Sequence, residues 1–358
     1  MDKGGIAHRL IAFAKALVGA LPGGLALINI ISAMLMGAIA GSAMASASAM
    51  GSILGPEMKR EGYSTEFSAA VNVTSATTGL IIPPSNILIV YSLASGGVSV
   101  AALFLAGYIP GILTGLLLMV VAMIWAKKKN YKTGKRSSAK QIFKTFIEGF
   151  PSLMLLVVVI GGIVAGVFTA TEASAIAVLY TLILGFIYRE ISIKNLPEII
   201  LSASATTAIV MLLIAASMGM SWIMSYENIP QDITTFLLEI SNNPFVILLI
   251  INLILLIVGT FMDMTPAVLI FTPIFLPVVT ALGMDPVHFG IIMILNLCIG
   301  LCTPPVGSVL FVGVGVAGTT IQKVIKPLVP LLAAMILALF LITYIPQISL
   351  WLPNLFDI

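Results

Sequence analysis

Long apolar segments alternate with short polar breaks along the chain. In order, the segments are 24–40, 49–56, 66–96, 101–126, 151–168, 173–188, 199–224, 245–282, 286–317 and 326–350. A helix needs about 20 apolar residues to cross a membrane, and several segments are shorter than this or are interrupted by Gly, Pro, Ser and Thr. The pattern predicts an all-α polytopic membrane protein in which some helices cross only in part. In residues 1–20 apolar and polar side chains alternate with the period of an amphipathic helix, so we expect this segment to lie along the membrane surface.

Two neighbouring segments are expected to be discontinuous. Residues 24–58 have a small, polar centre at 41–48 between short apolar arms, which favours a helical hairpin that enters and leaves on one side. Residues 66–96 are broken at Gly79 and at Pro83-Pro84, because proline cannot donate a backbone hydrogen bond. Unwound backbone within a membrane is tolerated only where it is buried in protein or lines a polar cavity.

The same arrangement recurs 221 positions later. At this offset Pro83 and Pro84 align with Pro304 and Pro305, and Gly79 aligns with Gly300. We therefore expect a second hairpin at 245–282 and a second broken helix at 286–317. The predicted organisation is a first repeat at 1–126 (hairpin 24–58, broken helix 66–96, span 101–126), a loop at 127–147, and a second repeat at 148–358 with its last span at 326–350. Repeats of this kind in an apolar chain indicate a transporter.

Composition and charge support a membrane location. Of the 358 residues 59% are hydrophobic and only 9% are charged, with a mean hydropathy of +1.15, whereas a soluble domain carries about 25% charge. Eight of the 17 Lys and Arg residues lie within 127–144: Lys127, Lys128, Lys129, Lys132, Lys135, Arg136, Lys140 and Lys144. Nucleic acid attracts such runs, but beside an apolar span the run is typical of a cytoplasmic loop, so no nucleic-acid partner is expected.

Counting spans from this loop gives the two repeats opposite orientations. The first hairpin then opens on the cytoplasmic side, where Lys59 and Arg60 lie, and the second opens on the other side. This is the inverted-repeat plan of many secondary transporters. The offset also places the partners of the segments that follow Pro151 about 70 positions before Met1, so we expect roughly two further helices, from a longer chain or a separate polypeptide.

The candidate chemistry lies where the hairpin tips meet the breaks. Asp263 is one of two acids in apolar surroundings, and hydroxyls and unwound carbonyls beside it are ligands that a small hard cation prefers. The predicted sodium site 2 comprises Thr260, Asp263, Thr265, Thr303 and Gly307, and sodium site 1 comprises Gly41, Ser42, Ser46, Ser85 and Asn86. Helix N-termini at both tips suit a carboxylate substrate, for which the candidates are Ser42, Ser46, Ser85, Asn86, Asp263 and Thr303.

Other conspicuous residues are explained by structural roles. Small hydroxylated residues also let helices approach closely, although two such clusters related by a repeat favour a site. Glu172, the second acid, follows Thr169 and Thr171 and is expected to cap the next helix. Cys298 and Cys302 are expected in the core, since a metal site needs more ligands.

An intramembrane hydrolase or a pump would need a nucleophile–base pair, a metal motif or a phosphate loop; none is visible, so we expect no enzyme.

Several stretches resemble one family. They are Gly4-Gly-Ile-Ala, Gly41-Ser-Ala, Gly51-Ser-Ile-Leu, Ile82-Pro-Pro-Ser85, Gly166-Val-Phe-Thr-Ala-Thr-Glu-Ala173 and Thr303-Pro-Pro-Val-Gly307. Together they resemble the large membrane subunit (DctM-like) of tripartite ATP-independent periplasmic (TRAP) transporters. The subunit of that family normally begins about 70 residues earlier, and many relatives carry an acid where this chain has Ser46.

The resemblance implies an elevator-type carrier in the bacterial inner membrane. Its hairpins and broken helices would form a moving transport domain, and the other helices would form a scaffold completed by a small four-helix membrane subunit. A periplasmic binding protein would deliver an organic acid such as a C4-dicarboxylate or sialic acid, and Na⁺ would be the coupling ion, with no other cofactor. The alternative is a stand-alone sodium–dicarboxylate symporter of related architecture. Because the repeat offset leaves roughly two spans unaccounted for, we expect the chain not to transport alone.

Overall fold

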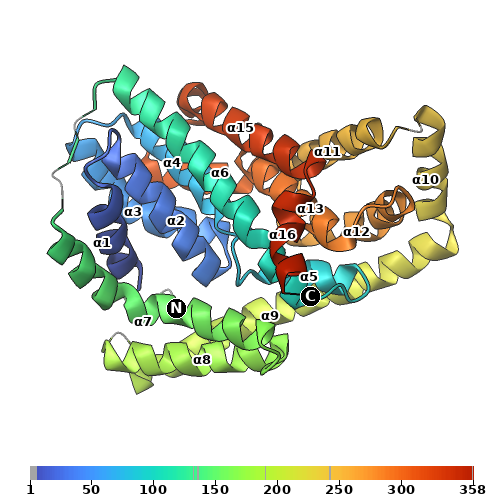
Figure 1. The fold of residues 1–358 in the computed structure, drawn as a ribbon, viewed down its shortest axis with the longest axis horizontal. Coiled ribbons are helices and arrows are strands. Elements are labelled where there is room, and N and C mark those ends of the chain that lie inside the picture. The colour runs from blue at the N-terminus through green and yellow to red at the C-terminus, as the bar shows by residue number, and fades with distance from the viewer. Residues whose placement is uncertain (1–5, 132, 135–136, 190, 242, 357) are drawn as a thin grey trace.

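The computed structural model describes residues 6–131, 133–134, 137–189, 191–241, 243–356 and 358. In these residues all regular structure is helical, as predicted (Figure 1). The helices are α1 (Ile6–Val18), α2 (Gly24–Ala40), α3 (Ala43–Arg60), α4 (Thr65–Thr78), α5 (Asn86–Ala94), α6 (Val100–Lys128), α7 (Ala139–Val164), α8 (Ala170–Ile187), η1 (Ile193–Asn195), α9 (Leu196–Tyr226), α10 (Ile229–Ile240), α11 (Pro244–Phe261), α12 (Met264–Ala281), α13 (Pro286–Cys302), α14 (Ser308–Ala317), α15 (Ile321–Tyr344) and α16 (Gln347–Leu355).

Length and composition allow five of the described helices to cross a membrane, which agrees with a multi-pass membrane protein. They are α6, η1 with α9, α11, α12 and α15. Figure 1 shows α1–α4 on one side of the molecule and α10–α12 on the other, while α7, α8 and α9 lie along one long edge. The centre is formed by α4 and α13, which contact each other and are buried along nearly their whole lengths.

The first hairpin consists of α2 and α3, and two residues join them. Gly41 has a left-handed backbone (φ 63°) and donates its N–H to the carbonyl of Gly37, which ends α2. Glycine adopts this conformation without the steric cost that a Cβ would bring. Ser42 then caps α3, because its Oγ accepts a hydrogen bond from the N–H of Ala45 at 3.3 Å. The short polar tip in the sequence is therefore a C-cap followed directly by an N-cap.

The second hairpin consists of α11 and α12, again with two connecting residues, Met262 and Asp263. Each arm has 18 residues. Both arms are therefore long and apolar enough to cross a membrane by composition, so their re-entrant path stays a prediction.

Each broken helix is interrupted at its paired prolines. In the first, α4 ends at Thr78 and α5 begins at Asn86; in the second, α13 ends at Cys302 and α14 begins at Ser308. The bonds Pro83–Pro84 and Pro304–Pro305 are both cis. Hydroxyls in the buried α4 donate to carbonyls of the preceding turn, as Thr74 and Thr78 do to Ala70 and Thr74, so they need no water.

Two boundaries differ from the sequence-based expectation. The last span, expected at 326–350, begins earlier and ends at Tyr344, and α16 follows as a separate helix. Pro346 explains this break, because it lacks an N–H and disfavours a helical conformation at Ile345. The basic segment, expected as a loop at 127–147, is shorter than that, since Ser138 caps α7 by accepting a hydrogen bond from the N–H of Gln141.

Candidate functional site

The tip of the first hairpin lies against the start of α5. A Cβ added to Gly41 would lie 3.4 Å from Cγ of Asn86, so the structure brings these two predicted site residues into contact. The Asn86 side chain is exposed, whereas Ser85 is buried and donates its Oγ–H to the carbonyl of Leu80 across the break. This end of the molecule therefore offers an amide side chain beside a hairpin tip.

Two predicted serines of site 1 are engaged within the hairpin. The Ser46 side chain is fully buried and its hydroxyl donates to the carbonyl of Ala33 at 3.2 Å, which joins α3 to α2. The hydroxyl oxygen of Ser42 accepts the capping bond of α3. Both oxygens keep a lone pair, yet their first role in this conformation is to hold the tip together.

The tip of the second hairpin is hydrogen-bonded to the second break. The N–H of Gly307 donates to the carbonyl of Thr260 at 3.1 Å. Gly307 has φ 32°, and a Cβ there would lie 2.9 Å from the carbonyl oxygens of both Leu301 and Thr303. Two backbone oxygens therefore lie beside the break residue that is hydrogen-bonded to the tip, and carbonyl oxygens are ligands that a hard cation accepts.

The hydroxyls of this second site have lone pairs to offer. Thr260 donates its Oγ1–H to the carbonyl of Ile257, and Thr303 donates its Oγ1–H to the carbonyl of Ile299, both at 2.7 Å. Once the proton is used in this way, the oxygen faces its surroundings only as an acceptor. Such oxygens suit a cation and cannot donate to a carboxylate.

Asp263 occupies the N-cap position of α12 but does not act as a cap. Its backbone is extended (φ −71°, ψ 158°), its side chain is exposed, and it makes no capping hydrogen bond. Within the described part of the chain its carboxylate has no hydrogen-bond or ion-pair partner. Thr265 is half-buried in the next turn, and no hydrogen bond joins Asp263 to Thr303. The acid is available to an incoming ligand.

Close glycine pairs hold each hairpin to its broken helix. A Cβ on Gly79 would lie 2.6 Å from Cα of Gly37, and a Cβ on Gly300 would lie 2.5 Å from Cα of Gly259. Backbone therefore contacts backbone at both places. A packing role for Gly37 and Gly259 was not predicted from the sequence, although each stands four residues before a tip residue, Gly41 or Asp263.

Glu172 has the structural role that the sequence indicates. It forms a capping box with Thr169 at the start of α8: its carboxylate accepts from the N–H of Thr169, and the Thr169 hydroxyl accepts from the N–H of Glu172. Thr171 is exposed, and its carbonyl accepts a hydrogen bond from Ser174. These residues are well explained as a helix start.

The two cysteines belong to the packed centre. Cys298 and Cys302 are fully buried and donate their S–H groups to the carbonyls of Thr77 and Val73 on α4. Among the described residues no group of three or more His, Cys, Asp or Glu side chains is placed to hold a metal ion. A cation site here would depend on hydroxyl and backbone oxygens with Asp263.

Comparison with known proteins identifies a family model and similar sequences. The family model described as "Tripartite ATP-independent periplasmic transporter, DctM component" matches residues 1–348. Similar proteins include YgiK of Salmonella typhimurium, 58% identical over 99% of this chain and 82% of its own length. The C4-dicarboxylate TRAP transporter large permease DctM of Pseudomonas aeruginosa is 41% identical over 99% of this chain and 83% of its own length. For the sialic acid TRAP transporter large permease SiaM of Vibrio cholerae the identity is 39%, with the same coverage.

Proposed function

Because the chain belongs to the DctM family of large permeases of TRAP transporters, we propose that it is the permease subunit of a sodium-coupled carrier that imports organic acids. The observation that carries this proposal is the contact of each hairpin tip with a helix break, Gly41 with Asn86 and Thr260 with Gly307. Discontinuous helices that meet in this way supply both helix ends and free backbone carbonyls to one place, as substrate and ion sites of secondary transporters require.

The packing of the helices supports an inverted repeat. The first arm of each hairpin packs against its own broken helix, α2 on α4 and α11 on α13. The second arm packs against both broken helices, α3 on α4 and α14, and α12 on α13 and α5. The long helices also contact both broken helices, α6 with α13 and α4, and α15 with α4 and α13. A two-fold relation between the halves accounts for all of these pairs.

The coupling ion would bind at the tips. At the second tip the unpartnered carboxylate of Asp263 supplies charge, and the hydroxyl oxygens of Thr260 and Thr303 supply lone pairs. At the first tip no acid is present, so oxygens of Gly41, Ser42 and Asn86 would carry more of the binding. Sodium is the ion that we propose, because oxygen ligands with little total charge suit a hard monovalent cation better than a transition metal.

The remaining helices would form the scaffold and meet the partners. The helix α9 and the preceding turn are apolar, and none of the most apolar stretch is buried within the described chain. Figure 1 shows α9 with α7 and α8 along one edge of the molecule. We propose that this edge faces lipid and a small four-helix subunit, while a periplasmic binding protein delivers the substrate at the outer face of a bacterial inner membrane. The hairpins and broken helices would then move together against this scaffold, as in an elevator.

Reconstitution tests the function directly. The chain, a small subunit and a binding protein would be placed in proteoliposomes, and uptake of labelled succinate and sialic acid would be measured with and without an inward sodium gradient. Sodium-driven uptake that requires all three proteins is expected. Uptake by the chain alone would contradict the three-part assembly and favour a stand-alone symporter, and uptake indifferent to sodium would contradict the coupling.

A further inference from the structure

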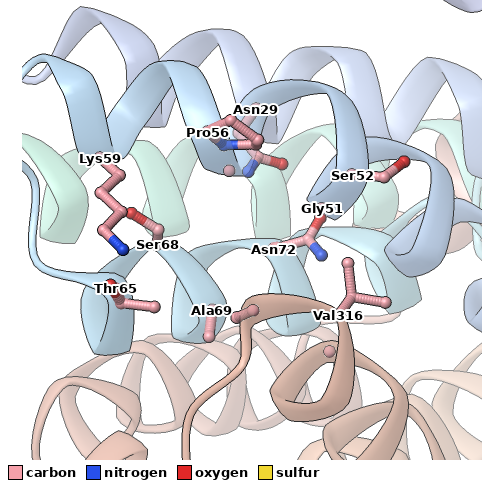
Figure 2. A pocket seen from close by; sticks show the side chains of 13 residues that line it. Asn29, Gly51, Ser52, Pro56, Lys59, Thr65, Ser68, Ala69, Asn72 and Val316 are labelled. Atoms are coloured by element: carbon pink, nitrogen blue, oxygen red, sulfur yellow. The ribbon is translucent and has the colours of Figure 1, made fainter.

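A cavity lies beside the first hairpin, away from both tips. It has a volume of about 450 Å³ and is bounded by α2, α3, α4 and α14. Small residues leave the space: Gly51, Gly55, Ala69, Gly313 and Ala317. The volume falls in the range of small-molecule sites, roughly 300–1,000 Å³. Figure 2 shows the residues that line it.

Two buried asparagines line this cavity with unpartnered oxygens. Asn29 and Asn72 are 1% and 2% exposed, and within the described structure neither Oδ1 has a hydrogen-bond partner. The orientation of Asn72 is fixed, because its Nδ2 donates to the carbonyl of Ala47 at 2.6 Å and a carbonyl can only accept. Its Oδ1 is therefore an acceptor that lacks a donor. Buried polar groups are nearly always paired, so each free oxygen is an acceptor that a molecule bound in the cavity can satisfy.

The second half of the chain contains a buried asparagine pair in a different arrangement. On α13 Asn296 donates its Nδ2–H to Oδ1 of Asn252 on α11 at 2.7 Å, and Asn252 in turn donates to Oγ1 of Thr343 at 3.2 Å. In the corresponding helices α4 and α2, Asn72 and Asn29 do not bond to each other. Asn252 and Asn296 are therefore paired with each other, although Oδ1 of Asn296 also lacks a partner among the described residues, whereas Asn29 and Asn72 both line the cavity.

The same cavity is lined by one positively charged side chain, that of Lys59. Lys59, near the end of α3, lines it, is exposed and forms no ion pair with a described residue. In Figure 2 its amino group lies toward Thr65 and Ser68, while Asn72 lies toward the other end with Gly51 and Val316. Among the described residues that line the cavity there is no Asp or Glu, so no carboxylate of the lining pairs with the lysine. A ligand with a negative end and a hydroxylated end matches this distribution.

We propose that this cavity is a second binding site of the chain and that it takes a small hydroxylated carboxylate. Lys59 binds the carboxylate, and the Oδ1 atoms of Asn29 and Asn72 accept hydrogen bonds from its hydroxyls. A lone metal ion fits less well because of the lysine, and a purely apolar acid leaves both oxygens unpaired. The proposal that the transported substrate binds here rests on the proposed function. The proposal that the cavity binds a small hydroxylated carboxylate does not depend on that function.

Direct binding tests the proposal. The full chain would be purified in detergent and titrated with radiolabelled gluconate in sodium-free choline buffer, with unlabelled gluconate and hexanoate as competitors. Saturable binding is expected that gluconate displaces and hexanoate, which lacks hydroxyls, does not. Lys59→Gln should weaken binding at least tenfold. Arg60→Gln, which removes the neighbouring exposed cation that does not line the cavity, should leave it unchanged within twofold.

Three results would overturn the proposal: no saturable binding to the wild-type chain, equal effects of Lys59→Gln and Arg60→Gln, or displacement by hexanoate as effective as by gluconate. Lys59 is exposed, so its replacement is compatible with folding, and elution as a single peak on size exclusion checks this. The absence of sodium separates the site from a coupled tip site. Lys59-dependent binding together with a failure of sodium-driven uptake would support the cavity and refute the proposed transport function.

Discussion

The N–H of Gly307 donates to the carbonyl of Thr260 at 3.1 Å, which joins the tip of the second hairpin to the break of the second broken helix. These residues are 47 positions apart in the sequence. Because the bond is between backbone groups, it fixes the relative position of the two elements whatever their side chains do. The carboxylate of Asp263 and the hydroxyl of Thr303 are thus presented from elements that are held together.

The glycine contact beneath this tip should tolerate no side chain. In Gly300→Ala the new Cβ would lie 2.5 Å from Cα of Gly259 and also touch its carbonyl, and backbone cannot move aside as a flexible side chain can. We expect the free energy of unfolding to fall by about 1–3 kcal/mol, which would be measured as a lower Tm in detergent. Gly315→Ala in α14 is the control, because its Cβ would meet nothing within 4 Å. Equal Tm values for both variants would contradict the close contact.

The capping box of α8 should matter for stability rather than transport. Glu172→Ala removes the carboxylate that accepts from Thr169, so we expect a modest fall in Tm and sodium-dependent uptake within about twofold of wild type. Thr169→Ala, which removes the other half of the box, should behave alike. A sodium dependence that changes in Glu172→Ala but not in Thr169→Ala would show that the acid has a role in coupling.

The orientation of the chain can be tested by cysteine labelling. Ser138 and Asn354 are both exposed, and the native Cys298 and Cys302 are fully buried, so they should not react with an impermeant thiol reagent. The basic segment before Ser138 predicts a cytoplasmic position for that residue, and the span count predicts a periplasmic C-terminus. In intact cells Asn354→Cys should be labelled and Ser138→Cys should be labelled only after lysis. Labelling of Ser138→Cys from outside would overturn the topology.

The roles of residues that change the local backbone conformation could be predicted from the sequence. Pro83-Pro84 and Pro304-Pro305 remove N–H groups, so they mark the breaks without knowledge of any neighbour, and Thr169 with Glu172 marks a helix start by spacing alone. The all-helical membrane fold followed from such local signals and from hydrophobicity.

Residues whose role depends on a distant neighbour could not be interpreted in this way. The sequence does not show that Asn252 and Asn296 bond to each other while Asn29 and Asn72 line a cavity, and this cavity at Lys59 arises from glycines on helices far apart in the chain. The end of α15 was missed for a simpler reason, because one proline at 346 outweighs a continuous apolar pattern.

The sodium activation curve of Asp263→Asn tests the central claim most directly. Initial uptake would be measured against sodium concentration in proteoliposomes that hold the complete transporter. Asparagine keeps the shape and removes the charge, so the sodium concentration for half-maximal uptake should rise roughly tenfold or more, while the exposed position leaves expression unchanged. Asp232→Asn, an exposed acid on α10, should keep the wild-type curve. A change in apparent substrate affinity with an unshifted sodium curve would contradict the assignment of Asp263 to a cation site.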